Sequence, residues 1–180
     1  MIVLAAVAVM MWLGVWQLQR LHWKESLLVR YAAAQSSTAI QPWPHDDIAP
    51  LSYSRVRSEC IRASGQSAIS GQNANRRPGW AHLADCEIAG GVRAKVILGW
   101  SLRPDQVPWT GGVVTGTYLD KGDQGVVIVA DPPLAGLQAN ARPDPRDLPN
   151  NHLSYAVQWF LFALTALVIY ALALRKRLKD

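Results

Sequence analysis

The stretch "LSYAVQWFLFALTALVIYALAL", residues 153–174, decides the fold because it holds twenty-two residues and no charged side chain. A helix that rises ~1.5 Å per residue is ~33 Å long over this stretch, which is enough to cross the hydrocarbon core of a bilayer. Backbone groups in lipid must form hydrogen bonds within their own segment, as they do in a helix. We therefore predict a transmembrane helix over residues 152–175 and a cytoplasmic basic tail over residues 176–180.

A second apolar run covers residues 2–18, where Gln17 is the only polar side chain. No basic segment precedes this run and no small-residue cleavage site directly follows it, which argues against a cleaved signal peptide. Helix-forming residues continue beyond it without Gly or Pro. These features predict a first transmembrane helix with an outer extension over residues 1–34.

Charges beside the two runs predict the orientation. The tail "RKRLKD", residues 175–180, places the C-terminus in the cytoplasm, so two spans place both termini there. The main domain then lies outside the cytoplasm. The first run fits this rule less well, because Arg20 and Lys24 lie on its outer side. We expect that Met1 is not the natural start, or that a basic leader is missing.

The middle of the chain predicts a small β-rich domain over residues 35–130, since Val-rich runs alternate with turn signals. Candidate strands cover residues 53–63, 80–88, 93–100, 113–119 and 124–130, and a hairpin loop covers 120–125. Residues 131–151 contain five prolines and predict an extended linker. The expected fold class is membrane α+β, with two transmembrane helices flanking a β-rich extracytoplasmic domain.

Charge and motifs exclude several classes of function. The net charge is +5, but residues 31–149 hold eleven basic and eleven acidic residues, so the excess is juxtamembrane. A nucleic-acid partner would require a basic patch on the folded domain. The chain also lacks a phosphate-binding loop, GxGxxG after a strand, HExxH and GxSxG. We expect a protein that is neither an enzyme nor a nucleic-acid binder.

Cys60 and Cys86 are the only cysteines, and both lie in the segment expected outside the cytoplasm. Disulfides persist there, so a structural disulfide is the leading interpretation. Two free buried thiols are the second interpretation. A thiol oxidoreductase or copper donor is the third, although the CxxC spacing of redox sites is absent.

The start of the second predicted helix carries the clearest candidate site. His152 lies at the outer interface of the membrane, and Tyr155, Ala156, Trp159 and Ala163 follow it at helical spacing on the same side. Small alanines would let a flat ligand or a neighbouring helix approach the backbone. One interpretation is a ligand site; the other is a histidine at a helix start capped by an asparagine, within an aromatic belt.

The first helix offers a matching surface at its outer end, formed at i, i+3, i+4 and i+7 spacing by Leu13, Trp16, Gln17, Arg20, Trp23 and Lys24. This aromatic and cationic surface could stack on a macrocycle while a cation meets its carboxylates. It could equally anchor the helix among anionic lipid headgroups.

Two motifs resemble the surfeit locus protein 1 family of cytochrome c oxidase assembly factors. They are "LGVWQLQRLHWKESLL", residues 13–28, and "NNHLSYAVQWFLFA", residues 150–163. Two stretches between these motifs are more weakly similar to the family: "YSRVRSECIRASG", residues 53–65, and "VILGWSLRP", residues 96–104. The sequence departs from the family where Ile97 and Leu98 replace the usual Asn-Arg, and its domain is shorter.

The resemblance implies a two-span inner-membrane assembly factor whose main domain lies in the periplasm or the intermembrane space. It also implies that the protein binds heme a and assists its insertion into oxidase subunit I, with heme A synthase as a further partner. The family's proposed iron ligand corresponds to His152. We hypothesise that Tyr155, Trp159, Trp16 and Trp23 pack around the heme, that Arg20 meets a propionate, and that His22 is a second ligand. The alternative is a heme-free scaffold or chaperone that holds an oxidase subunit during maturation.

Overall fold

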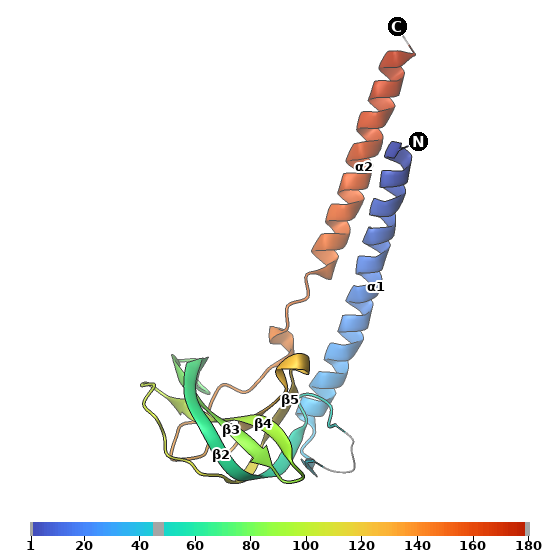
Figure 1. Cartoon of the computed structure of the whole chain (residues 1–180). Coiled ribbons are helices and arrows are strands. Elements are labelled where there is room, and N and C mark those ends of the chain that lie inside the picture. Colours follow the sequence, from blue (N-terminus) through green and yellow to red (C-terminus); the bar gives the residue numbers. More distant parts are fainter. Residues whose placement is uncertain (1, 45–48, 179–180) are drawn as a thin grey trace. The chain divides into compact units, whose positions relative to one another are not determined.

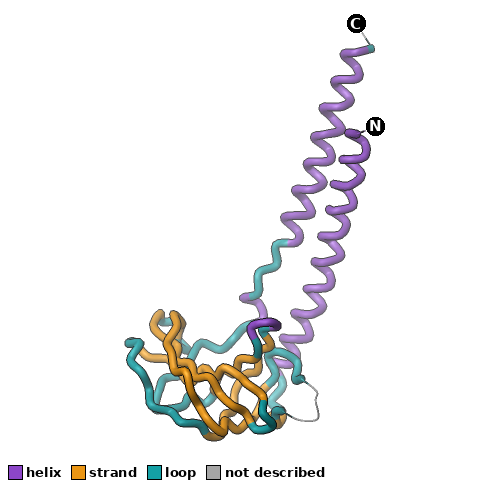
Figure 2. Tube along the Cα trace, viewed as in Figure 1, coloured by secondary structure: helices purple, strands orange, loops and turns teal. Residues whose placement is uncertain are grey.

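The computed structural model describes residues 2–44 and 49–178. The chain divides into two compact units: Met1–Val29 with Leu148–Asp180, and Arg30–Asp147. His45 and the last two residues of the basic tail lie outside the described residues. Figures 1 and 2 show the helices and strands along the chain.

The first unit contains the membrane helices. Helix α1 covers Ile2–Ser36 and continues into the second unit, and helix α2 covers His152–Arg177. Both are long and apolar enough to cross a membrane, and only 11% and 6% of their most apolar windows are buried. A core helix of a soluble protein would be mostly buried. The predicted fold class, a membrane α+β protein with two spans, is confirmed.

The second unit is built on six strands. They are β1 Ile40–Pro42, β2 Arg55–Gln72, β3 Pro78–Ile88, β4 Val92–Ser101, β5 Gly112–Asp120 and β6 Val126–Ala130. Short 3₁₀ helices cover Gly122–Gln124, inside the predicted β5–β6 hairpin loop, and Pro145–Asp147.

The sheet closes on itself because β2 is long enough to pair twice. Its residues 55–60 pair antiparallel with β5, and its residues 60–72 pair antiparallel with β3. The remaining neighbours are β3 with β4, β4 parallel to β6, and β6 with β5. The order β2-β3-β4-β6-β5 therefore forms a ring, with β1 parallel to β2 outside it.

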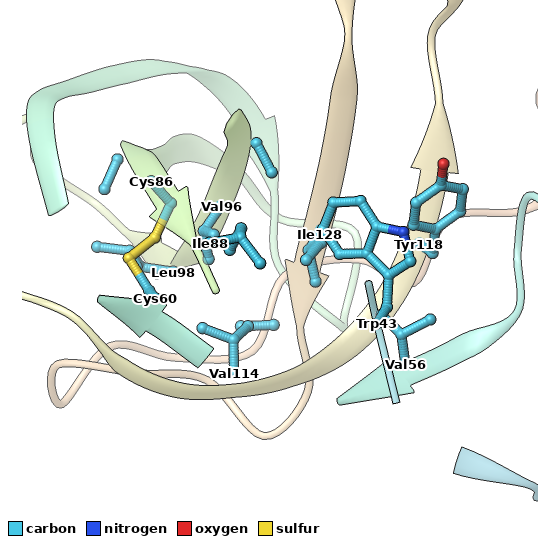
Figure 3. Close-up of a cluster of buried hydrophobic side chains, with 13 residues drawn as sticks. Trp43, Val56, Cys60, Cys86, Ile88, Val96, Leu98, Val114, Tyr118 and Ile128 are labelled. Atoms are coloured by element: carbon cyan, nitrogen blue, oxygen red, sulfur yellow. A yellow bond between two sulfur atoms is a disulfide. The ribbon is translucent and has the colours of Figure 1, made fainter. Parts of the chain in front are cut away.

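Inward-facing side chains of this ring form the core. Figure 3 shows Val56, Ile88, Val96 and Ile128 in the cluster with the disulfide that joins Cys60 of β2 to Cys86 of β3. Trp43, which follows β1, packs edge-on against Tyr118, with ring centroids 5.3 Å apart. The two cysteine Cα atoms are 5.6 Å apart, within the usual range for a bridge.

The Pro-rich segment differs from its expected role as an extended linker. Leu134 donates its N–H to Leu98 O at 2.8 Å, and Gln138 and Trp100 exchange two backbone hydrogen bonds. Leu134 and Leu137 also pack against the core. Residues 131–147 therefore belong to the β-rich unit, and the two leucines among the prolines pack against its core.

Strand boundaries also differ from the predicted ones. Strand β2 continues nine residues beyond the expected end at Ala63, through a run rich in Ser, Gly and Ala. Such residues have little intrinsic preference for strands, so neighbouring strands determine the structure there. Strand β1, only three residues long, was not predicted.

Candidate functional site

Small residues bring the two membrane helices into close contact. Gly14 of α1 and Ala156 and Ala163 of α2 are buried, whereas most neighbouring side chains are exposed. A Cβ at Gly14 would lie 2.5 Å from Cε1 of Phe160, so the phenyl ring occupies the space that a side chain would need. Small residues are the usual means by which membrane helices approach each other.

His152 forms a hydrogen bond to Gln17 across the helix pair, with 2.8 Å between His Nδ1 and Gln Oε1. Both side chains are partly buried. An amide oxygen only accepts hydrogen bonds, so Nδ1 carries the proton in this pairing. The lone pair of a neutral imidazole is then on Nε2, which remains available to a ligand.

A second hydrogen bond joins α1 to the residues just before α2. Lys24 of α1 donates a hydrogen bond from Nζ to the carbonyl oxygen of Pro149, three residues before the first residue of α2. Asn151 occupies the N-cap position, but its side chain makes no capping hydrogen bond. Gln17 and Lys24 thus tie the first turn of α2 to α1.

The predicted face of α2 is present as a continuous arc. Successive helical residues turn by about 100°, so His152, Tyr155 and Trp159 lie within about 60° of one another. Tyr155 is 51% exposed, and Trp159 is partly buried and packs edge-on against Phe162, with ring centroids 6.2 Å apart. The face therefore combines a partly buried imidazole with accessible aromatic surface.

The predicted face of α1 divides into two parts. Gln17 and Lys24 contact residues 149–152, as described above. Arg20 instead lies over the rings of Trp16 and Trp23, at 5.7 and 5.3 Å from their centroids. The two indoles are 39% and 54% exposed, so this cation–π cluster is an accessible surface.

Antiparallel geometry places part of each face on the same side of the helix pair. Arg20 is about 60° around α1 from Gln17, and Tyr155 is about 60° around α2 from His152. When two antiparallel helices face each other at one residue pair, residues that follow the two members of the pair by the same number of positions lie on the same side of the helix pair. Arg20, Tyr155 and Trp159 therefore flank the His152–Gln17 pair on one side.

Other predicted residues lie farther from this pair. Trp16 and Trp23 are about 100° and 120° around α1 from Gln17, and His22 is about 140° away in the opposite sense. His22 is exposed. The structure thus brings His152 together with Gln17, and it does not bring His22 onto the same side of α1.

The donor set suits a group that needs one protein ligand. Among residues 2–44 and 49–178, no cluster of three or more His, Cys, Asp or Glu side chains is arranged to hold a metal ion. A heme, whose iron is already held by the nitrogens of the macrocycle, would need only one ligand from the chain, and a neutral imidazole could supply it. His152 with a free Nε2, beside exposed aromatic rings and Arg20, fits this requirement.

The cysteines do not form an exposed redox site. Cys60 and Cys86 are each 2% exposed and are joined within the core. A thiol that exchanges disulfides or delivers copper needs access to its partner. The geometry is that of a structural bridge.

Sequence reasoning assigned no individual role to Gln17, although it is the only polar side chain in the first apolar run. Buried polar groups in membranes are expected to have partners, so this signal was available.

Sequence reasoning also missed a cavity of about 470 Å³ in the β-rich unit, whose lining includes Gln35, Arg76, Arg142 and Arg146. Beside it, hydrogen bonds from Arg146 lower the pKa of Asp144 to about 2.

The model of the SURF1 family matches residues 4–164, which include both helix motifs and the whole β-rich unit. No curated protein matches the chain.

Proposed function

Because the chain belongs to the SURF1 family, a family of oxidase assembly factors, we propose that it binds heme a and assists its insertion into subunit I of cytochrome c oxidase. The single observation that carries this proposal is the hydrogen bond between His152 and Gln17, 2.8 Å long, which leaves Nε2 of the histidine free. Heme A synthase is the proposed source of the heme. The role is non-enzymatic.

The surroundings of His152 support a binding site for a lipophilic macrocycle. Tyr155 and Trp159 offer ring surface on the same arc of α2, and Arg20 lies on the same side of the helix pair. A guanidinium is a suitable partner for a propionate. The close packing at Gly14 and Phe160 leaves no room for a macrocycle there, so the proposed site is the outer end of the pair. A carrier must also release its cargo, so we expect moderate affinity.

Heme content tests the proposal directly. The full-length chain is produced together with heme A synthase, purified in detergent, and assayed for bound heme a by its pyridine hemochrome spectrum. We expect heme in the wild type, little in His152→Ala, and an unchanged amount in His22→Ala, because His22 points elsewhere on α1. Equal heme in wild type and His152→Ala would contradict the ligand assignment.

The same measurement separates the two candidate functions. The exposed cluster of Arg20 with Trp16 and Trp23 is the observation that favours a scaffold, since it offers an aromatic and cationic surface to a partner. A wild type that remains free of heme but is purified together with oxidase subunit I would support the heme-free scaffold.

We also propose an inner-membrane location with both termini in the cytoplasm and the β-rich unit in the periplasm or intermembrane space. Arg175, Lys176 and Arg177 at the end of α2 support a cytoplasmic C-terminus, and the disulfide supports an oxidising compartment for the β-rich unit. In intact cells or spheroplasts, a membrane-impermeant maleimide should label Asn75→Cys, and it should label Leu178→Cys only after lysis. Both positions are exposed. The reverse labelling would contradict this orientation.

A further inference from the structure

We propose that Gln17 is a positioning residue for His152: it holds the ring as the Nδ1–H tautomer and directs Nε2 towards the iron of a bound heme. The inference rests on the proposed function, because it assigns Gln17 a role at the same site. It begins from the contact of Gln17 Oε1 with His152 Nδ1 at 2.8 Å. The two residues are 135 positions apart in sequence, so only the packing of α1 against α2 brings them together.

The chemistry of the two side chains determines which nitrogen is free. A neutral imidazole has one N–H and one lone pair, and the lone pair binds metal. Gln17 Oε1 accepts the Nδ1 proton and thereby leaves the lone pair on Nε2. Histidines that bind metals usually donate their other N–H to such an acceptor, which fixes the ring orientation and raises the basicity of the ligand.

The position of Gln17 in the chain agrees with this role. It is the only polar residue between Ile2 and Leu18, in a helix that otherwise presents apolar side chains. A buried amide in a membrane helix is unfavourable unless it is hydrogen-bonded. Gln19, two residues away on the same helix, is exposed and makes a matched control of the same residue type.

Two side chains of α1 also determine the orientation of the start of α2. Lys24 Nζ donates a hydrogen bond to the carbonyl oxygen of Pro149, and Gln17 Oε1 accepts one from His152, the first residue of α2. These contacts are about seven residues apart on α1, two helical turns, and therefore lie on one side of it. The ring of His152 is thus positioned from α1 rather than by its own helix, where the side chain of the N-cap residue Asn151 makes no capping hydrogen bond.

The first measurement uses the heme-free protein. Long-range ¹H–¹⁵N correlation spectra of the full-length, ¹⁵N-histidine-labelled chain in detergent micelles distinguish the two tautomers, and His152→Ala identifies the signal. We expect the Nδ1–H form in wild type and in Gln19→Leu. In Gln17→Leu we expect the Nε2–H form, which an unconstrained histidine side chain prefers. A wild-type Nε2–H form, or no change in Gln17→Leu, would overturn the inference.

The second measurement adds heme a to each variant and follows binding by absorption. We expect about tenfold weaker binding in Gln17→Leu, in keeping with the loss of an outer-shell partner, and wild-type affinity in Gln19→Leu. Gln17→Glu keeps the acceptor and adds negative charge near the ring, so it should bind heme and lower its reduction potential. If Gln17 had a purely structural role, Gln17→Glu would not change the reduction potential of the bound heme.

The two measurements separate the failure of this inference from that of the proposed function. Heme binding that requires His152 but is equal in wild type and Gln17→Leu would overturn the role of Gln17 and leave the proposed function standing. A wild type that takes up no heme would overturn both. Circular dichroism of each variant checks that α1 and α2 still form, and Gln17→Glu provides a second substitution if Gln17→Leu does not fold.

Discussion

The phenyl ring of Phe160 lies against the backbone of Gly14, so closely that a Cβ at position 14 would be 2.5 Å from the ring atom Cε1. This contact sets the distance between α1 and α2, together with the buried Ala156 and Ala163 on the facing helix. The His152–Gln17 hydrogen bond lies at the end of the same interface where α2 begins. Helix packing and the proposed ligand geometry are therefore coupled.

We expect Gly14→Leu to separate the helices and to destabilise the membrane unit by about 1–3 kcal/mol, because the added side chain overlaps Phe160. Thermal unfolding of the full-length chain in detergent measures the loss. Val15→Leu is the control, since Val15 is 46% exposed and adds bulk away from the contact. Equal stability of Gly14→Leu and Val15→Leu would contradict the close packing.

The Cys60–Cys86 disulfide joins β2 to β3 within the core and closes a loop whose ends are 26 residues apart. The double variant Cys60→Ser, Cys86→Ser should lose about 3 kcal/mol, because the unfolded chain regains the freedom that the loop restricts. Chemical denaturation of both proteins in detergent measures the difference. The variant should still support oxidase assembly; a loss of assembly in a stably folded variant would favour a redox role.

Stability should depend on Asp144 at low pH. The side chain and backbone of Arg146 donate hydrogen bonds to Asp144, which lowers the pKa of its carboxyl from 3.8 to about 2. A carboxyl whose pKa is lower in the folded state stabilises folding fully above its unfolded pKa and loses this contribution as the pH falls towards the folded pKa. The contribution is therefore present above pH 4 and declines between about pH 4 and 2.

The test compares wild type with Asp144→Asn in denaturation experiments from pH 6 to pH 2. The difference in unfolding free energy between the two should shrink as the pH falls. In an Arg146→Met background this pH dependence should be weaker but still present, because the side-chain hydrogen bonds are lost while the backbone N–H of residue 146 still donates to Asp144. A difference that stays constant over the whole range would show that the ion pair does not stabilise the fold.

Both membrane helices and the β-rich class could be predicted from the sequence because their signals are local. An uncharged stretch such as residues 153–174 needs no knowledge of its neighbours to be identified. The Val-rich strands β4, β5 and β6 were found within a few residues of their ends for the same reason. The family was also recognisable, since its two motifs lie on these helices.

Pairings over long distances in sequence could not be predicted. Closure of the sheet depends on β2 meeting β5, and neither strand carries a sign of its partner. The partner of Gln17 is 135 residues away. The sequence pattern therefore identified a polar residue in an apolar helix, but it did not identify His152 as the donor of its hydrogen bond. The face of α1 was likewise predicted as one surface, whereas in the structure Gln17 and Lys24 contact residues 149–152 and Arg20 packs on the rings of Trp16 and Trp23.

Gly99 accommodates the Pro-rich segment where it crosses β4. A Cβ at this position would overlap the Cβ of Leu137 and lie 2.9 Å from Gln138 O. Gly99→Ala should therefore push residues 134–141 away from β4 and cost about 1–3 kcal/mol of stability. Denaturation measures the total, and hydrogen exchange locates it.

The amides of Leu134 and Gln138 donate to Leu98 and Trp100 of β4, so both should exchange faster in Gly99→Ala. Amides in the β5–β6 hairpin provide the internal control, because that pairing does not involve the Pro-rich segment. Faster exchange at all of these sites would indicate general unfolding instead. Unchanged exchange at Leu134 and Gln138 would show that the segment is not held by β4, and residues 131–151 would then act as the extended linker that their prolines suggest.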